Sequence, residues 1–156
     1  MSDQGSAPDL DLRWADPDDV EAMVELLEFG SLVPGKEDPG HLAPYRDAMA
    51  EIAAGSGGLL VAERHGAVVG VCQLIVFRHL QQHGGRCAEI ESVHVHPEHR
   101  GLGIGHALMR AAIARATELG CYRVQLTSNV ARADAHRFYA SLGFEATHRG
   151  FKMVLD

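Results

Sequence analysis

The sequence has few cysteines, and their arrangement excludes two kinds of site. Its 156 residues include three cysteines, and no two of them are separated by the Cys-x-x-Cys spacing. An odd number of cysteines without that spacing indicates neither a disulfide framework nor a zinc centre. Cys72 and Cys121 lie in apolar runs, so we expect both to be buried as small hydrophobic residues.

Long apolar runs and an excess of positive charge are also missing. No apolar stretch approaches the roughly 18 residues that a membrane-spanning helix needs. The 14 Lys and Arg residues are outnumbered by 21 Asp and Glu residues, which gives a formal net charge of −7. This charge disfavours nonspecific binding to nucleic acids and to anionic membranes, and it is compatible with cationic substrates such as amines.

The first residues lack the features of a targeting signal. Residues 1–9 are polar and have no basic start, so they do not resemble a secretory signal peptide, and we expect a cytoplasmic protein. We expect this segment to be disordered. The rest of the chain has no repeat and no linker, and its length suits one hydrophobic core. Residues 10–156 are therefore expected to form a single domain.

The periodicity of apolar residues predicts alternating strands and helices. The expected strands cover 10–14, 58–64, 67–77, 86–95, 122–127, 144–147 and 151–155. The expected helices begin near 17, 41, 104 and 134 and end near 30, 54, 119 and 142. This order predicts an α/β (α+β) domain in which one sheet lies between helices.

A glycine-rich segment separates the strand at 86–95 from the longest expected helix. It reads Arg100-Gly101-Leu102-Gly103-Ile104-Gly105. The backbone N–H groups at a helix start, together with the positive end of its dipole, form an anion cradle that glycines leave open. Arg100 adds a cation, so the segment predicts a phosphate-bearing ligand. A dinucleotide fingerprint would need glycine at His106, and a P-loop would need Gly-Lys before Ser or Thr, so neither fits.

Two motifs together resemble the GNAT superfamily of N-acetyltransferases. The first is Arg-x-x-Gly-x-Gly, from Arg100 to Gly105. The second is Ala135-His136-Arg137-Phe138-Tyr139 with Leu142-Gly143-Phe144, which follows the family pattern A-x-x-F/L-Y-x-x-x-G-F. The resemblance implies a GNAT fold: one mixed, mostly antiparallel sheet of six to seven strands, helices on both faces, and a splayed parallel strand pair that binds CoA. It also implies acetyl-CoA as co-substrate and no metal.

The resemblance assigns the CoA-binding groups. The strand Ala88–Val95 would carry a bulge, and its backbone would bind the pantetheine arm and supply an N–H to the oxyanion. Ideal alternation along this strand places Glu89, Glu91, Val93 and Val95 on one face and Ile90, Ser92 and His94 on the other. The expected CoA-binding residues are Val93, His94, Val95, Arg100, Gly101, Leu102, Gly103, Ile104, Gly105, His106, Asn129 and Tyr139.

The resemblance also suggests an acid and a base. Tyr139 would protonate the departing CoA thiolate, although such an aromatic residue can also simply pack a helix. An amine must lose a proton before it attacks a thioester, and Glu91 or Glu89 would take that proton. Two carboxylates on one partly buried face repel each other, so one pKa should rise. We favour Glu91 slightly, and the alternative is that one of the two is a solvated or salt-bridged residue.

A histidine pattern gives an alternative that we do not favour. His94-x-His96-x-x-His99 could hold a metal ion, since His94 and His96 would face one way on an ideal strand. Pro97 ends that strand, however, and His99 leads into the phosphate loop, where a metal is unnecessary. We therefore expect no metal.

A more specific resemblance is to the GNAT branch that includes aminoalkylphosphonate N-acetyltransferases. It rests on Glu89-Ile90, Pro97, Arg100-Gly101-Leu102, Leu126–Val130, Arg132, Asp134–Tyr139 and Thr147–Lys152. It implies acetylation of a small primary amine by direct attack in a ternary complex. A phosphonate would need cations such as Arg78, Arg86, Arg132 or Arg149. The alternatives are a protein or peptide N-acetyltransferase and a non-catalytic acyl-CoA-binding regulatory module. A homodimer is also plausible.

Overall fold

The computed structural model describes residues 9–156, which form two compact units. The larger unit ends at Gln125, and the smaller one comprises Leu126–Asp156. Of the segment 1–9 that we predicted to be disordered, all but Asp9 lies outside the described residues. Within the described part of the chain, no helix combines the length and apolarity that crossing a bilayer requires.

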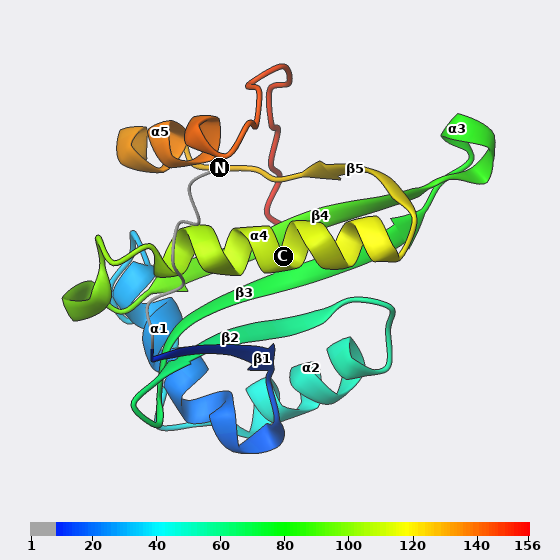
Figure 1. Cartoon of the computed structure of the whole chain (residues 1–156). Coiled ribbons are helices and arrows are strands. Elements are labelled where there is room, and N and C mark those ends of the chain that lie inside the picture. The colour runs from blue at the N-terminus through cyan, green and yellow to red at the C-terminus, as the bar shows by residue number, and fades with distance from the viewer. Residues whose placement is uncertain (1–8) are drawn as a thin grey trace. The chain divides into compact units, whose positions relative to one another are not determined.

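Strands and helices alternate along the larger unit (Figure 1), and the smaller unit adds one helix. The strands are β1 (Leu10–Trp14), β2 (Gly58–Arg64), β3 (Ala67–Arg78), β4 (Arg86–Val95) and β5 (Cys121–Gln125). The helices are η1 (Pro17–Asp19), α1 (Val20–Gly30), α2 (Ala43–Ala53), the short α3 (Gln81–Gly84), η2 (Pro97–His99), α4 (Ile104–Glu118) and α5 (Ala133–Ser141).

The strands form one mixed, mostly antiparallel sheet in the order β1-β2-β3-β4-β5. From β1 to β4 each strand is antiparallel to the next, and within residues 9–156 only β4 and β5 run parallel. Five strands among residues 9–156 are fewer than the six to seven predicted. The segments 144–147 and 151–155 are not strands, because their backbone pairs with no strand and an alternating apolar pattern cannot supply the missing partner.

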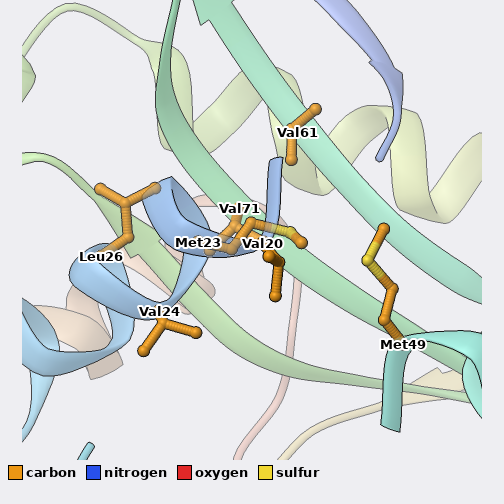
Figure 2. Close-up of a cluster of buried hydrophobic side chains, with 7 residues drawn as sticks. All are labelled: Val20, Met23, Val24, Leu26, Met49, Val61 and Val71. Atoms are coloured by element: carbon orange, nitrogen blue, oxygen red, sulfur yellow. The ribbon is translucent and has the colours of Figure 1, made fainter. Parts of the chain in front are cut away.

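One face of the sheet is covered by α1 and α2, and a compact apolar core lies between these helices and the sheet. Figure 2 shows this core, in which helix and strand side chains lie side by side. Its buried members are Val20, Met23, Val24, Leu26, Met49, Val61 and Val71. The apolar residues of α1 recur at helical spacing, so one stripe of the helix meets the sheet.

The other face of the sheet is covered by α4. A Cβ atom added to Gly70 of β3 would lie 2.9 Å from Leu108 and 3.2 Å from Ile104, so only glycine allows α4 to approach this closely. Cys72, two residues further along β3, is fully buried, and burial raises the pKa of its thiol to about 12. Cys121 is only half-buried, so the prediction that both cysteines are buried is wrong for Cys121. It lies at the start of the edge strand β5, where no further strand covers it.

A capping box and an ion pair fix η1, the short helix that leads into α1. Asp16 accepts a hydrogen bond from the Asp18 N–H at 2.9 Å, and the Asp19 carboxylate accepts one from the Asp16 N–H at 2.8 Å. Arg13 donates to both oxygens of Asp19 at 2.7 and 2.8 Å and to Glu63 at 2.9 Å. Asp19 is only 7% exposed, and the hydrogen bond from Arg13 lowers its pKa. This network ties β1 and β2 to the helix.

We expect Asp19→Ala to destabilise the fold by about 2–4 kcal/mol, because it removes two hydrogen bonds of the part-buried Arg13 and the acceptor of the Asp16 N–H. Denaturant unfolding at neutral pH measures this cost. Because the pKa of Asp19 is lowered on folding, its contribution should fade as the pH falls below the ordinary value of 3.8. Glu21→Ala, at an exposed position of α1, is the control. Equal losses for the two variants would contradict the role of Asp19.

Candidate active site

A bulge interrupts β4 just before the glycine-rich segment. Val71 of β3 pairs with His94 and Gln73 pairs with Glu91, so Cys72 lies opposite two residues, Ser92 and Val93. Ser92 has a φ of +54°, in the left-handed region that non-glycine residues rarely adopt. One extra residue and a left-handed conformation define a β-bulge. The bulge that the family resemblance implied is therefore present, centred on Ser92.

The bulge changes which side chains share a face. Val95 pairs with Gly70, which faces α4, whereas His94 pairs with Val71, which packs in the core beside α1. Glu91 is on the His94 side, because its partner Gln73 lies two residues from Val71. The prediction that Glu91 shares a face with Val93 and Val95 is thus wrong, because the extra residue inverts the alternation after Glu91.

His94 packs against the end of α1. A Cβ atom added to Gly30, the last residue of that helix, would overlap the His94 imidazole ring. Glycine at this position therefore lets the end of α1 lie directly against β4. The contact places α1 beside the bulge and fixes the His94 side chain on the face that also carries Glu91.

Glu89 acts on the ionisation of Glu91, two residues further along β4. Glu89 lies opposite Gln125 of β5 and accepts a hydrogen bond from the Gln125 side-chain amide at 2.8 Å. Partial burial, and secondly a hydrogen bond and the charge repulsion from Glu89, raise the pKa of Glu91. The expectation that one pKa of the pair rises is confirmed. The structure places the rise at Glu91, which can therefore hold a proton at higher pH than an ordinary glutamate.

The raised pKa of Glu91 predicts a stability effect with a defined sign. A carboxyl with a raised pKa makes the folded protein bind more protons, so stability falls as pH rises from 4.5, the ordinary value, through the folded pKa. Glu91→Gln removes this pH-dependent loss of stability, because glutamine does not ionise. We expect the variant to melt at a higher temperature than the wild type at mildly alkaline pH, and the difference to vanish in acid. Scanning calorimetry across pH tests this, and a pH-independent difference would contradict it.

The glycine-rich segment forms the start of α4. Gly101 and Gly103 have φ values of 77° and 79°, a conformation that side-chain-bearing residues rarely adopt. Gly103 is the N-cap residue and has no side chain to cap the helix, and the first helical hydrogen bond runs from the Ala107 N–H to the Gly103 carbonyl. The backbone N–H groups of the first turn thus precede the hydrogen-bonded part of the helix, as an anion cradle requires.

The remaining predicted residues of this segment have distinct environments. Ile104 is buried beneath the helix start and anchors it, whereas Leu102 is 49% exposed. Gly105 and His106 lie half-buried in the first turn. Arg100 is exposed, and its Nε donates to the Val95 carbonyl at 3.2 Å, which ties the segment to the end of β4. The structure therefore brings the bulge, Arg100 and the uncapped helix start together.

The histidines of the metal alternative are not arranged around a common point. His94 faces α1, whereas the His96 and His99 rings meet edge to face with centroids 5.6 Å apart. His96 Nδ1 accepts a hydrogen bond from the Glu98 N–H at 3.2 Å. No group of three or more His, Cys, Asp or Glu side chains among residues 9–156 is placed to hold a metal ion.

The second motif lies in the smaller unit, where it ends α5. Gly143 has a φ of 91°, its N–H donates to the Ala140 carbonyl, and the Phe144 N–H donates to the Tyr139 carbonyl at 3.1 Å. This pair of hydrogen bonds is a Schellman motif. The Tyr139 and Phe144 rings meet edge to face at 6.1 Å. The spacing Tyr-x-x-x-Gly-Phe therefore has a structural role in stopping the helix and fixing the Tyr139 ring.

Asn129, predicted to bind CoA, organises the turn before α5. Its side-chain oxygen accepts a hydrogen bond from the Ala131 N–H at 2.9 Å, and its carbonyl is 2.9 Å from a ring nitrogen of His136. The side-chain contact is an Asx turn.

Of the cations considered for a phosphonate, Arg78 and Arg86 donate to backbone carbonyls of Gly84 and Leu119. These two arginines therefore stabilise loops.

Sequence reasoning missed two residues of the site. Ser92 carries no signal of its bulge, because serine has no special preference for the left-handed region. Gln125 contacts Glu89 only because β4 and β5 pair in one particular register. The only sequence signal for Gln125 was its place in the strand expected to lie parallel to the glutamate strand.

The fold and the glycine-rich helix start define an acyltransferase of the CoA-binding type. The Acetyltransferase (GNAT) family matches residues 20–144. That match covers most of the chain, which therefore belongs to the GNAT family of acetyltransferases.

Several proteins are similar to part or nearly all of the chain. An aminoalkylphosphonate N-acetyltransferase of Salmonella typhimurium is 37% identical over 95 residues, which cover 61% of each chain. An aminoglycoside N(6')-acetyltransferase type 1 of Stenotrophomonas maltophilia is 31% identical and covers 97% of this chain and 96% of its own. The crystal structure of a transcriptional regulator from Bacillus halodurans C-125 has a TM-score of 0.87 and 37% identity, and covers 94% of this chain and 99% of its own.

Proposed function

We propose that residues 10–156 act as an acetyl-CoA-dependent N-acetyltransferase that transfers an acetyl group to the primary amine of a small molecule, in the cytoplasm. The main observation behind this proposal is the order of structural features along the segment from Glu89 to Gly105. A carboxylate pair, a bulge and an uncapped glycine-rich helix start follow one another within this short segment. Family membership and relatives that are N-acetyltransferases support it.

The residues of the larger unit would bind and aim the co-substrate. Backbone N–H groups from Gly101 to His106 would hold the diphosphate of acetyl-CoA, and Arg100 would add a positive charge. The bulge at Ser92 interrupts the register with β3, and the pairing of β4 with β5 ends at Glu89, before the backbone groups of Val93, His94 and Val95. These groups would bind the pantetheine arm, and one N–H would donate to the carbonyl oxygen as it gains negative charge.

Glu91 would act as the base. Its carboxylate takes a proton from the ammonium group of the acceptor, which leaves a neutral amine and a protonated Glu91. The nitrogen lone pair then attacks the thioester carbon, the new C–N bond forms and the C–S bond breaks. A raised pKa suits Glu91 to this role, because a stronger base takes the proton more readily.

Tyr139 would act as the acid, as the family motif implies. Its phenol would give a proton to the departing CoA thiolate, the second proton that the nitrogen loses as the amide forms would restore the phenol, and Glu91 would release its proton to solvent. The Schellman motif and the contact with Phe144 hold the Tyr139 ring on α5. No residue is required to carry the acetyl group, so direct attack in a ternary complex accounts for the reaction.

Small amines are the favoured acceptors. The aminoalkylphosphonate and aminoglycoside relatives act on small molecules, and the net charge of −7 would attract cationic amines. The test is release of CoA thiol from acetyl-CoA with a panel of aminophosphonates, amino sugars, aminoglycosides and a lysine peptide. Turnover with a small amine above the hydrolysis background is expected. Turnover with the peptide alone would favour a protein acetyltransferase, and CoA binding without any transfer would favour a regulatory module.

A further inference from the structure

A chain of polar contacts links β5 to the carboxylate pair of β4. Gln125 Nε2 donates to Glu89 at 2.8 Å, and Gln125 Oε1 lies 3.6 Å from the Cys87 thiol. Arg123 Nε in turn donates to the Cys87 sulfur at 3.3 Å. The parallel register pairs Cys87 with Arg123 and Glu89 with Gln125, so both pairs lie on one face of the sheet.

The two ends of the Gln125 side chain differ in what they can do. The amide nitrogen only donates hydrogen bonds, whereas the amide oxygen only accepts them. A carboxylate next to the nitrogen is thus stabilised as an anion, and the thiol next to the oxygen can donate to it. Both neighbours, Glu89 and Cys87, favour the same orientation of the amide.

We propose that Gln125 is a positioning residue that fixes the Glu89 side chain beside Glu91, so that Glu91 is the member of the pair that carries the proton. This inference rests on the proposed function. Glu89 and Glu91 lie two residues apart on one face of β4, so ionised Glu91 faces the charge of the side chain that Gln125 fixes. Gln125 thus controls how tightly the pair holds its single proton.

Other charged groups of the larger unit on this face do not replace the role of Gln125. Near the pair they are His94 on β4, Arg123 on β5 and the exposed Glu51 of α2, whereas Arg13 and Glu63 on the far strands pair with each other. From β3, the residues opposite the pair are Gln73 and Ile75, which carry no charge. The shift in the pKa of Glu91 arises from burial and from Glu89, and the hydrogen bond to Glu89 comes from Gln125.

Two substitutions of Gln125 should act in opposite directions. Gln125→Leu removes the donor, so the dianionic pair is less stable and the acidic limb of the kcat/KM profile should move to higher pH. On that limb kcat/KM should fall roughly tenfold, because losing a hydrogen bond to a charged group changes an ionisation equilibrium by about one factor of ten. Gln125→Lys adds a cation and should move the limb to lower pH. Gln81→Leu removes an exposed amide elsewhere and should leave the profile unchanged.

The titration of the carboxyl pair provides a readout that does not need turnover. NMR of isotopically labelled glutamate carboxyls, with Glu91→Gln used for assignment, should show the pair titrating at higher pH and the proton shared with Glu89 in Gln125→Leu, and the pair titrating at lower pH in Gln125→Lys. Unshifted titration in both variants would overturn the role of Gln125, whether or not the wild type transfers acetyl groups. Absence of transfer with the expected titration shifts would instead overturn the proposed function and leave the positioning role supported.

Discussion

Glu91→Gln should lower kcat for amine acetylation by about 10²–10⁴-fold, the range that a positioned general base contributes. Glutamine has nearly the same shape but cannot take a proton from the acceptor ammonium. CoA affinity should stay close to that of the wild type, because the backbone groups proposed to bind CoA are unchanged. The measurement is steady-state acetylation of the best amine, with the affinity for CoA determined by calorimetry.

The control for this variant is another glutamate changed in the same way. Glu25 is exposed on α1, and Glu25→Gln should leave turnover unchanged. Glu89→Gln tests which of the two glutamates is the base. Its effect on kcat should be smaller than that of Glu91→Gln, because Glu89 affects the proton transfer only through Glu91. If Glu89→Gln were the more damaging variant, the base would have to be reassigned to Glu89.

Tyr139→Phe is the second change with a large expected effect. It removes only the hydroxyl, so the ring contact with Phe144 and the Schellman motif at the end of α5 should persist. Without the acid, the thiolate must leave unprotonated, and kcat should fall by about 10²-fold or more. Turnover is measured by thiol release at saturating acetyl-CoA, and folding by the melting temperature.

Tyr122→Phe is the matched control for Tyr139→Phe. Tyr122 on β5 is 41% exposed, and its hydroxyl contacts a ring nitrogen of His79 at 2.7 Å. Loss of this surface contact should leave kcat nearly unchanged. Unchanged turnover in Tyr139→Phe as well would remove Tyr139 from the mechanism and leave it only the structural role of ending α5.

Much of the fold could be predicted from local signals. The Asp16-Pro17 start before α1, the glycine pair before α4 and Gly143 after α5 all mark helix ends by rules of backbone conformation that hold wherever they occur. Short-range alternation likewise predicted β1 to β4. These features depend on neighbours in the sequence, so the sequence contains the information that they need.

The features that could not be predicted from the sequence depend on contacts between distant segments. The left-handed conformation of Ser92 is imposed by pairing with β3, and it inverted the faces predicted for Val93 and Val95. The contact between Gln125 and Glu89 requires the parallel register of two strands that are separated by α4. The two C-terminal segments had strand-like alternation, but a strand also needs a partner, and Phe151 is 92% exposed.

Calorimetric titration of coenzyme A into the purified protein tests the central claim most directly, with pantetheine, which lacks the diphosphate, as the comparison ligand. The account predicts saturable binding of CoA at one site per chain and an affinity for pantetheine at least tenfold weaker, because the helix start of α4 binds the diphosphate. No heat on addition of CoA, or equal affinity for the two ligands, would contradict it.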